Sequence, residues 1–121
     1  MFTSVDPRTE EVFASYPLMD TAEVTKIIDS VDQAFKEYRK TSFEDRRGWL
    51  MNAASLLRAR KDFLAKLMAR EMGKPLAQGI GEIEKSAWVC EYYAEKGESF
   101  LQSELIETDA SKSFVAYKAL G

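Results

Sequence analysis

The residue types best suited to chemistry are scarce in this chain of 121 residues, which contains no histidine and one cysteine, Cys90. The absence of histidine excludes from these residues an imidazole base, a Ser-His-Asp triad and a histidine-ligated metal. A single cysteine excludes an internal disulfide and a four-cysteine zinc site. Cys90 lies among small residues at helical spacing, and no helix start lies close enough to activate it. We therefore expect Cys90 to be structural.

Carboxylates are the next group that could carry out chemistry. Four glutamates in the second half of the chain could act as an acid and base pair or bind a hard cation: Glu82, Glu84, Glu91 and Glu95. Glu91 and Glu95 are separated by one helical turn. Solvated charge on a helix face explains such a pattern more simply. We therefore predict neither a catalytic nor a metal-ligating role for these side chains.

Two glycine-containing segments could hold a phosphate. Residues 79–84, Gly-Ile-Gly-Glu-Ile-Glu, superficially resemble a dinucleotide-binding loop, but Glu84 replaces its third glycine and no strand precedes it. A carboxylate at that point would also repel a pyrophosphate. Gly73, Lys74 and Pro75 lack the earlier glycine and the following hydroxyl residue of a Walker-type loop. The sequence thus predicts helix packing at the first segment, a helix stop at the second, and no cofactor-binding residue.

Charge and hydropathy also restrict the partners. The net charge is −3, so no overall basic potential attracts nucleic acid or an anionic lipid surface. No stretch approaches the roughly 20 apolar residues that span a bilayer, and the N-terminus lacks the pattern of a signal peptide. We expect no nucleic acid partner, no membrane partner and a cytoplasmic location. The most basic stretch lacks interleaved aromatic residues and gives little support for nucleic acid binding: Arg46, Arg47, Arg58, Arg60 and Lys61.

The elements that would position any site begin with an extended segment. Residues 1–18 contain two strand-like runs on either side of the turn formers Asp6 and Pro7, which predicts a β-hairpin. An isolated two-stranded hairpin is marginal in water, so it needs another element to lie against. Hydrophobic residues make up 45% of the chain and charged residues 31%, which is typical of an ordered globular protein.

Three long helices are predicted over residues 20–102. The first begins near Asp20, because Asp20 and Glu23 have the spacing of a capping box and precede apolar residues at helical spacing. The second begins at Ser42, with Asp45 as its capping partner. Both helices therefore carry their start signal in the sequence.

The second helix is expected to continue to Gly73, which suits a left-handed helix end and is followed by Pro75. Trp49, Leu56 and Phe63 widen its apolar face. A helix so broadly apolar is expected to be wedged between neighbouring elements.

The third helix is expected to begin at Pro75 or Leu76 and to pack tightly, antiparallel to the second. The middle of its apolar stripe consists of small residues, which would let another backbone approach closely. Its stripe contains residues spaced alternately four and three apart: Leu76, Ile80, Ile83, Ala87, Cys90, Ala94, Gly97 and Leu101.

The last part of the chain is expected to form strands at residues 104–107 and 113–118, joined by a polar turn. The fold class is therefore α+β and mainly α, with three long helices flanked by an N-terminal and a C-terminal β-hairpin. We expect residues 1–121 to form a single unit, made of the hairpin 1–18, the helices 20–102 and the hairpin 104–121. The strands lack partners within this chain.

Several segments, taken in order, resemble the N-terminal part of the NAD(P)-dependent aldehyde dehydrogenase superfamily. Residues 5–12, Val-Asp-Pro-Arg-Thr-Glu-Glu-Val, resemble its opening hairpin, although Glu10 stands where the family has a turn glycine. Residues 71–76, Glu-Met-Gly-Lys-Pro-Leu, match its Glu-x-Gly-Lys-Pro-Leu element. Residues 82–94 look most like the succinate-semialdehyde dehydrogenase branch, and residues 115–121 resemble the strand before the family's Pro-Trp-Asn-Phe-Pro segment.

This resemblance covers essentially the whole chain and implies a fragment of the α/β aldehyde dehydrogenase fold. It implies an oxidoreductase that converts an aldehyde, in this branch succinate semialdehyde, to its acid through a thiohemiacetal, with NAD or NADP as hydride acceptor. It also implies that the family's catalytic cysteine, general-base glutamate, oxyanion-hole asparagine and nicotinamide-site glycines lie beyond Gly121. The chain alone is therefore expected to bind no cofactor and to be catalytically incompetent. Ala119 replaces a family proline, which predicts a less rigid last strand.

The resemblance further implies that the helices support the cofactor domain and that the hairpin 104–121 begins the oligomerisation strands. Unpaired strand edges and exposed apolar faces predict that the chain self-associates into a homo-oligomer, with the rest of the dehydrogenase fold as its other partner. The alternative is a stand-alone helical oligomerisation or protein-interaction module. A third hypothesis is that the chain retains weak nucleotide affinity.

Overall fold

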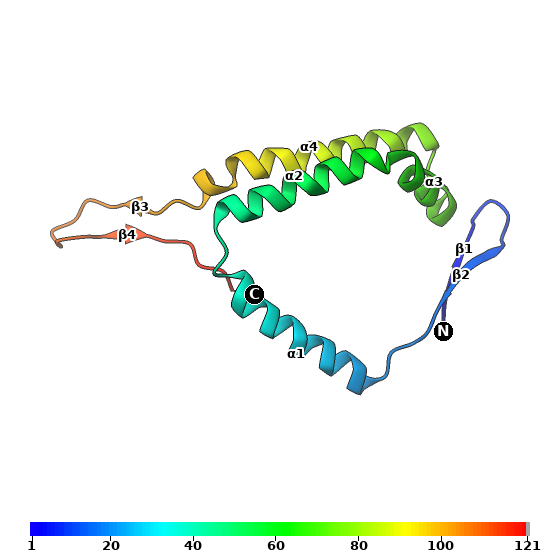
Figure 1. The fold of residues 1–121 in the computed structure, drawn as a ribbon, viewed down its shortest axis with the longest axis horizontal. Helices are drawn as coiled ribbons and strands as arrows, with labels where there is room; N and C mark the ends of the chain where they lie inside the picture. The colour runs from blue at the N-terminus through cyan, green and yellow to red at the C-terminus, as the bar shows by residue number, and fades with distance from the viewer. Residues whose placement is uncertain (121) are drawn as a thin grey trace.

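The structure, a computed structural model, describes residues 1–120. It is mainly helical, with two small antiparallel hairpins, and this confirms the predicted fold class. Gly121, the last residue of the predicted hairpin 104–121, lies outside the described residues. The elements in chain order are β1 (Phe2–Val5), β2 (Val12–Tyr16), α1 (Thr21–Tyr38), α2 (Phe43–Ala59), α3 (Lys61–Met72), α4 (Leu76–Phe100), β3 (Glu104–Leu105) and β4 (Phe114–Val115) (Figure 1).

Both predicted helix starts are confirmed as capping boxes. The Asp20 carboxylate accepts a hydrogen bond from the Glu23 amide at 2.8 Å, and the Glu23 carboxylate accepts one from the Asp20 amide at 3.0 Å. Ser42 and Asp45 exchange the same pair of bonds, each at 3.1 Å. Hydrogen bonds from Ser42 hold the pKa of the Asp45 carboxyl below its usual value. These four side chains satisfy amide groups that would otherwise lack partners at the starts of α1 and α2.

The second predicted helix is wrong as a single element, because it consists of α2 and α3. Arg60 ends α2 and precedes α3 with φ −106° and ψ 11°, outside the helical region. No glycine or proline marks this position in the sequence. The break turns α3 so that it packs against the first half of α4, while α2 packs along the rest of α4 (Figure 1). The predicted stop is confirmed, since Gly73 has φ +71°.

The core lies where α4 packs against α2 and α3, and it is made of small residues. Figure 1 shows α2 and α4 side by side with opposite chain directions, as predicted. Ala54, Ala65 and Ala87 are at most 1% exposed, and Ile83 is buried beside them. A Cβ placed on Gly79 would lie 3.2 Å from the Cβ of Ala65. The backbones of α3 and α4 therefore approach closely at Gly79, which lies outside the stripe predicted for the third helix.

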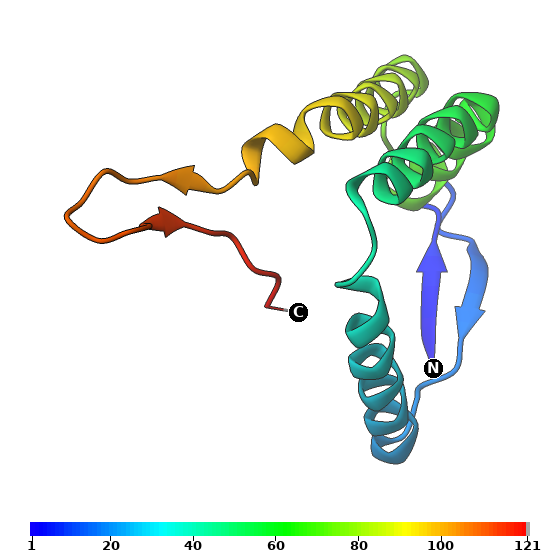
Figure 2. The same ribbon diagram turned by 60° about the vertical axis from the view of Figure 1, so that its left-hand side comes forward.

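The chain does not enclose itself. Its accessible surface is 9893 Å², whereas a compact monomer of this mass exposes about 6,600 Å². Figures 1 and 2 show why: α1 extends away from the α2–α4 pair, and the β3–β4 hairpin projects from the C-terminal end of α4. No residue of α1 is buried. The described residues therefore form one small helical core, and α1 and the β3–β4 hairpin extend from it without being covered.

The expectation that the second helix is wedged between neighbours is wrong on one side. Trp49 is 51% exposed, Leu56 is 53% exposed and Phe63 is 56% exposed. On the other side, α2 and α3 both pack against α4. The breadth of the apolar face thus indicates a second contact surface that residues 1–120 do not cover.

The predicted N-terminal hairpin is present, and it lies against α3. β1 and β2 pair antiparallel, with Phe2 opposite Tyr16 and a register shift between Ser4 and Val5. The guanidinium of Arg70 lies 4.3 Å from the ring centroid of Phe13 and joins α3 to β2. This contact supplies the neighbour that an isolated hairpin needs.

The hairpin loop holds Glu10 in a left-handed conformation with φ 60°. The Glu10 amide donates to the Asp6 carbonyl at 2.8 Å and the Asp6 amide donates to the Glu11 carbonyl at 2.9 Å, which fixes this geometry. The family glycine that Glu10 replaces would adopt it without a Cβ clash. The loop around Glu10 is therefore a strained turn of defined geometry.

Glu10→Gly is expected to stabilise the protein by about 0.5–1 kcal/mol, because the relief of left-handed strain exceeds the added flexibility of the unfolded chain. Thermal unfolding of the variant and of the wild type measures the effect. Glu11→Gly is the matched control, since Glu11 has no positive φ, and it should lower the midpoint. A lower midpoint for Glu10→Gly would contradict the assignment of strain.

The C-terminal strands are shorter than predicted. Instead of residues 104–107 and 113–118, only two residues pair on each side, Glu104 with Val115 and Leu105 with Phe114. The hairpin packs against no other element, so nothing extends its ladder. Among residues 1–120, no helix has the length and apolar character that crossing a membrane requires.

Candidate functional site

The best-defined polar cluster joins α2, α3 and α4. The Arg58 guanidinium donates to Glu84 at 3.1 Å and binds both carboxylate oxygens of Glu91, one of them at 2.8 Å. The Lys61 ammonium donates to the other oxygen of Glu84 at 2.7 Å. Glu84 and Glu91 lie seven residues apart on one face of α4, so one arginine can reach both. We call these four residues the interhelix ion-pair cluster.

The cluster shifts the ionisation of its members. Hydrogen bonds from Lys61 and Arg58 hold the pKa of the Glu84 carboxyl below its usual 4.5, and Arg58 does the same for Glu91. In return, Glu91 raises the pKa of Arg58 and Glu84 raises that of Lys61. All four groups therefore stay charged near neutral pH. Such a cluster holds the helices together. Its members do not change protonation state near neutral pH, so they do not act as an acid or a base.

Glu91→Gln is expected to lower the thermal midpoint near neutral pH, because it removes the bidentate partner of Arg58. A carboxyl with a lowered folded-state pKa stabilises the fold above its usual pKa and loses this effect as the pH falls. The deficit of the variant should therefore shrink below pH 4.5. Thermal unfolding at several pH values tests this.

Glu95→Gln is the matched control, because Glu95 is an exposed glutamate on the same helix and makes no side-chain bond in the described residues. It should change the midpoint little at any pH. A Glu91→Gln deficit that persists undiminished at about pH 3 would contradict the role given to the ion pairs.

The interpretation of the four glutamates as solvated charges on a helix face leaves out the ion pairs that three of them form. Glu84 and Glu91 belong to the interhelix ion-pair cluster, and Glu82 pairs with Lys74. The sequence carries a signal for these ion pairs. Arg58 and Lys61 are three residues apart, so both can face Glu84 and Glu91, which are seven residues apart on one helix. Among the described residues, no group of three or more side chains is arranged to hold a metal ion.

The two glycine segments lie where helix packing was predicted. Gly79 and Gly81 both lie in α4, and Gly79 is buried against Ala65. Gly81 faces open space, with nothing within 4 Å of the position that a Cβ would take. Gly73 and Pro75 form the boundary between α3 and α4.

Cys90 is a free, half-buried thiol on α4. It lies in the apolar stripe that faces α2, between Ala87 and Ala94. Its structural role is still a prediction, since nothing in these contacts tests it.

The basic stretch serves the helix junctions. Arg46 joins the end of α1 to α2, because its side chain donates to the Thr41 hydroxyl at 2.9 Å and to the Tyr38 carbonyl at 3.1 Å. Its guanidinium also lies 4.9 Å from the Tyr38 ring centroid, and Tyr38 stacks on Trp49. Arg60 covers Phe63 at 5.1 Å. Arg47 is exposed.

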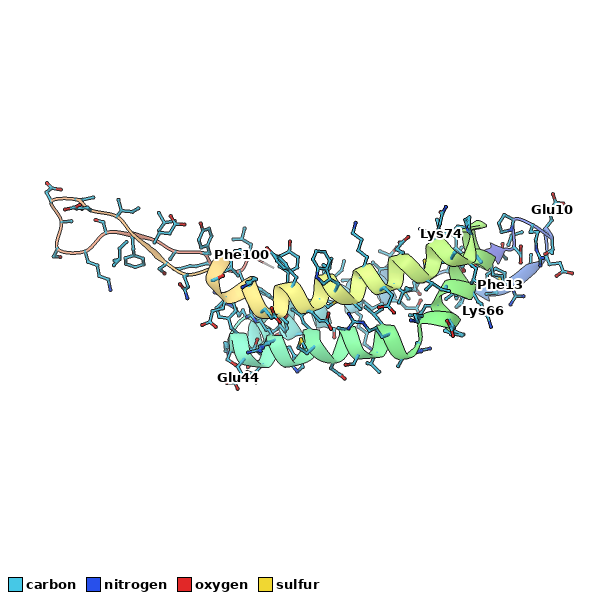
Figure 3. The ribbon with its side chains drawn as sticks, turned by 90° about the horizontal axis from the view of Figure 1, so that it is seen from above. Glu10, Phe13, Glu44, Lys66, Lys74 and Phe100 are labelled. Carbon is cyan, nitrogen blue, oxygen red and sulfur yellow. The ribbon has the colours of Figure 1, made fainter. Side chains whose placement is uncertain are left out.

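A cleft of about 600 Å³ lies at the opposite end, between the β1–β2 loop, the end of α3 and the start of α4. Four cationic side chains line it, and we call it the basic cleft. Figure 3 shows Lys66 and Lys74 at this end of the molecule, near Phe13. The lining consists of Asp6, Arg8, Lys66, Ala69, Arg70, Gly73, Lys74 and Leu76.

Two apolar faces are uncovered. On α1, most of the apolar residues at helical spacing are exposed, from Val24 at 43% to Val31 at 62%, while Phe35 is half-buried. On α4, aromatic rings contact one another and remain half exposed: Trp88, Tyr92, Tyr93 and Phe100. Exposed faces of this kind mark surfaces that bind other protein.

Sequence comparison matches these residues to known proteins over their whole length. A family model described as "Aldehyde dehydrogenase family" matches residues 1–121. A probable succinate-semialdehyde dehydrogenase [NADP(+)] of Synechocystis is 39% identical over 118 residues, which cover 98% of this chain and 26% of that protein. A succinate-semialdehyde dehydrogenase [NADP(+)] of Deinococcus radiodurans is 34% identical over 120 residues, covering 99% of this chain and 25% of that protein.

The fold is also similar to solved structures. The succinic semialdehyde dehydrogenase of Streptococcus pyogenes, solved in complex with NADP+, superposes with a TM-score of 0.92 at 28% identity. The match covers 100% of this chain and 27% of that chain. The chain thus spans about a quarter of the length of the relatives that it matches.

Proposed function

The chain belongs to the aldehyde dehydrogenase family, and from this we propose that it is the N-terminal part of an NADP+-dependent succinate-semialdehyde dehydrogenase. The observation that carries the proposal is that the relatives matched over nearly the whole chain are named for this activity and this cofactor. The reaction would oxidise the aldehyde to its carboxylate with water as the oxygen donor, while a hydride passes to NADP+.

We propose that residues 1–120 do not themselves hold NADP+. The glycine pair that could have approached a pyrophosphate lies inside α4, and the space next to Gly79 is filled by Ala65 of α3. The glutamates that could have acted on a substrate are paired with Arg58, Lys61 and Lys74. The side chains that perform the chemistry are therefore assigned to the rest of the enzyme.

The role proposed for this segment is structural support. Its core fixes α4 against α2 and α3, while the stripe of α1 and the aromatic face of α4 are available to the rest of the polypeptide. The last described residues lie near the exposed face of α1. Tyr117, Lys118 and Ala119 line clefts together with Arg39 and Arg46 at the α1–α2 junction. We propose that the following residues pack against these exposed faces.

The β3–β4 hairpin is proposed as a subunit contact of a homo-oligomer. Among residues 1–120, the hairpin projects beyond the helical core and contacts no other element (Figure 1). Leu105 is 77% exposed and Phe114 is 52% exposed. Unpaired strand edges with exposed apolar side chains are stable in solution when another chain covers them. The residues 104–121 would then begin the oligomerisation strands, as the family resemblance implies.

Production of NADPH from succinate semialdehyde and NADP+ tests the activity. The full-length protein that carries these residues should oxidise this aldehyde, and a purified chain of residues 1–121 should show no turnover and no heat of NADP+ binding. The second result is expected because the chain covers a quarter of its relatives. A full-length protein that oxidises no aldehyde, or turnover by residues 1–121, would overturn the proposal.

A cytoplasmic location is also proposed, because a single cysteine fits a reducing compartment. The alternative of a stand-alone interaction module finds no support in the matches, which run from end to end of the chain within dehydrogenases.

A further inference from the structure

The basic cleft has a volume of about 600 Å³, and its charges come from three separate parts of the chain. Arg8 lies in the β1–β2 loop, Lys66 and Arg70 lie one turn apart on α3, and Lys74 lies just before α4. One carboxylate, Asp6, lines the same cleft. Asp6 is 8% exposed and accepts a hydrogen bond from the Arg8 backbone amide at 2.9 Å. The cleft therefore has an excess of positive charge.

Three of these cations have no anionic partner among the described residues. Lys74 pairs with Glu82, but Arg8, Lys66 and Arg70 form no ion pair in residues 1–120. Three unpaired like charges around one cleft repel one another unless an anion lies between them.

Ordinary helix electrostatics do not explain the cluster. A cation is favoured in the last turn of a helix, and this accounts for Arg70 near the end of α3. The effect is confined to the terminal turn, so it does not account for Lys66, six residues before the helix ends. Arg8 belongs to a hairpin loop and to no helix. The ring of Phe13 also positions the Arg70 guanidinium, which keeps this donor ordered at the cleft.

We propose that the basic cleft binds a polyphosphate group of a small molecule, at a site separate from the cofactor site of the enzyme. Guanidinium groups bind phosphate oxygens in a bidentate manner, and lysine adds a point charge. Arg8 lines the cleft from the hairpin loop and Arg70 lines it from α3, and the proposed pyrophosphate would lie between these two elements. Bound ligand would then fix the hairpin against α3.

Isothermal titration of the full-length protein with inorganic pyrophosphate tests the proposal, with NADP+ present at saturation so that the cofactor site is filled. The variants are Arg8→Gln and Lys66→Gln, each of which removes one unpaired cation from the cleft. Lys26→Gln is the matched control, since Lys26 is an exposed lysine on α1 with no ion-pair partner in the described residues. Orthophosphate serves as the second probe, because it carries less charge and fewer oxygen atoms than pyrophosphate.

The wild type is expected to bind pyrophosphate more tightly than orthophosphate. Each cleft variant should weaken pyrophosphate binding by roughly tenfold or more, and Lys26→Gln should leave it unchanged. The proposal is overturned if saturating NADP+ abolishes binding, if the cleft variants bind as the wild type does, or if no heat is detected. NADP+ binding and turnover are measured on the same variants, so a failure of the proposed enzyme activity is recognised separately.

Discussion

Gly79→Leu is expected to lower the stability of the protein by about 3 kcal/mol, because a side chain larger than hydrogen overpacks a tight helix contact. The Cβ alone would lie 3.2 Å from the Ala65 Cβ and 3.3 Å from the Ala65 Cα. Part of that contact is backbone, so rotation of a side chain cannot relieve the clash. Separation of α3 from α4 would also expose Ala65 and Ile83, which are buried.

Gly81→Leu is the matched control for this prediction. Gly81 lies two residues further along α4 with open space around its Cβ position, so leucine should raise stability by about 0.8 kcal/mol through helix propensity. The thermal midpoint of the two variants and of the wild type measures both effects. Equal midpoints for the two variants would contradict the close packing of α3 on α4.

Replacing Leu105 and Phe114 together with aspartate is expected to dissociate the oligomer. The two residues pair across the β3–β4 hairpin and expose apolar side chains. Two buried carboxylates without partners would each cost several kcal/mol in a subunit contact. Light scattering coupled to gel filtration should show a smaller species, and no change in mass would contradict the proposed contact.

Ala110→Asp with Ser111→Asp is the control for this pair. Both residues lie in the polar turn between β3 and β4 and are exposed. The same two charges are added to the same hairpin, but outside its apolar surface. The oligomer should therefore keep its mass.

Local signals in the sequence predicted the helix boundaries well. The starts at Asp20 and Ser42 and the stop at Gly73 depend on side chains and backbone within a few residues, which the chain order itself supplies. The same holds for the N-terminal hairpin around Asp6 and Pro7.

Features that depend on tertiary packing were not predictable in the same way. The break at Arg60 has no glycine or proline, and it accompanies the turn of α3 that places Ala65 against Gly79. The pairing of Arg58 with Glu84 and Glu91 joins two helices, so the spacing within each helix did not predict it. In each case the cause is a contact between residues far apart in the sequence.

The exposed apolar residues have a different explanation. Trp49, Leu56 and Phe63 fit a helix wedged between neighbours, and residues 1–120 supply a neighbour on one side. The periodicity of α1 likewise predicted a buried stripe, whereas no residue of α1 is buried. The sequence pattern therefore describes the complete fold of the family, of which this chain is about a quarter.

Hydrogen exchange of the α1 amides, compared between residues 1–121 alone and the full-length protein, tests most directly whether this segment is support for a larger enzyme. An 18-residue helix that has no buried residue and contacts α2 near its end, at Tyr38, is marginal in water. The α1 amides should exchange rapidly in the isolated chain and be strongly protected in the full-length protein. Equal protection of α1 in both would contradict the claim that the rest of the dehydrogenase covers it.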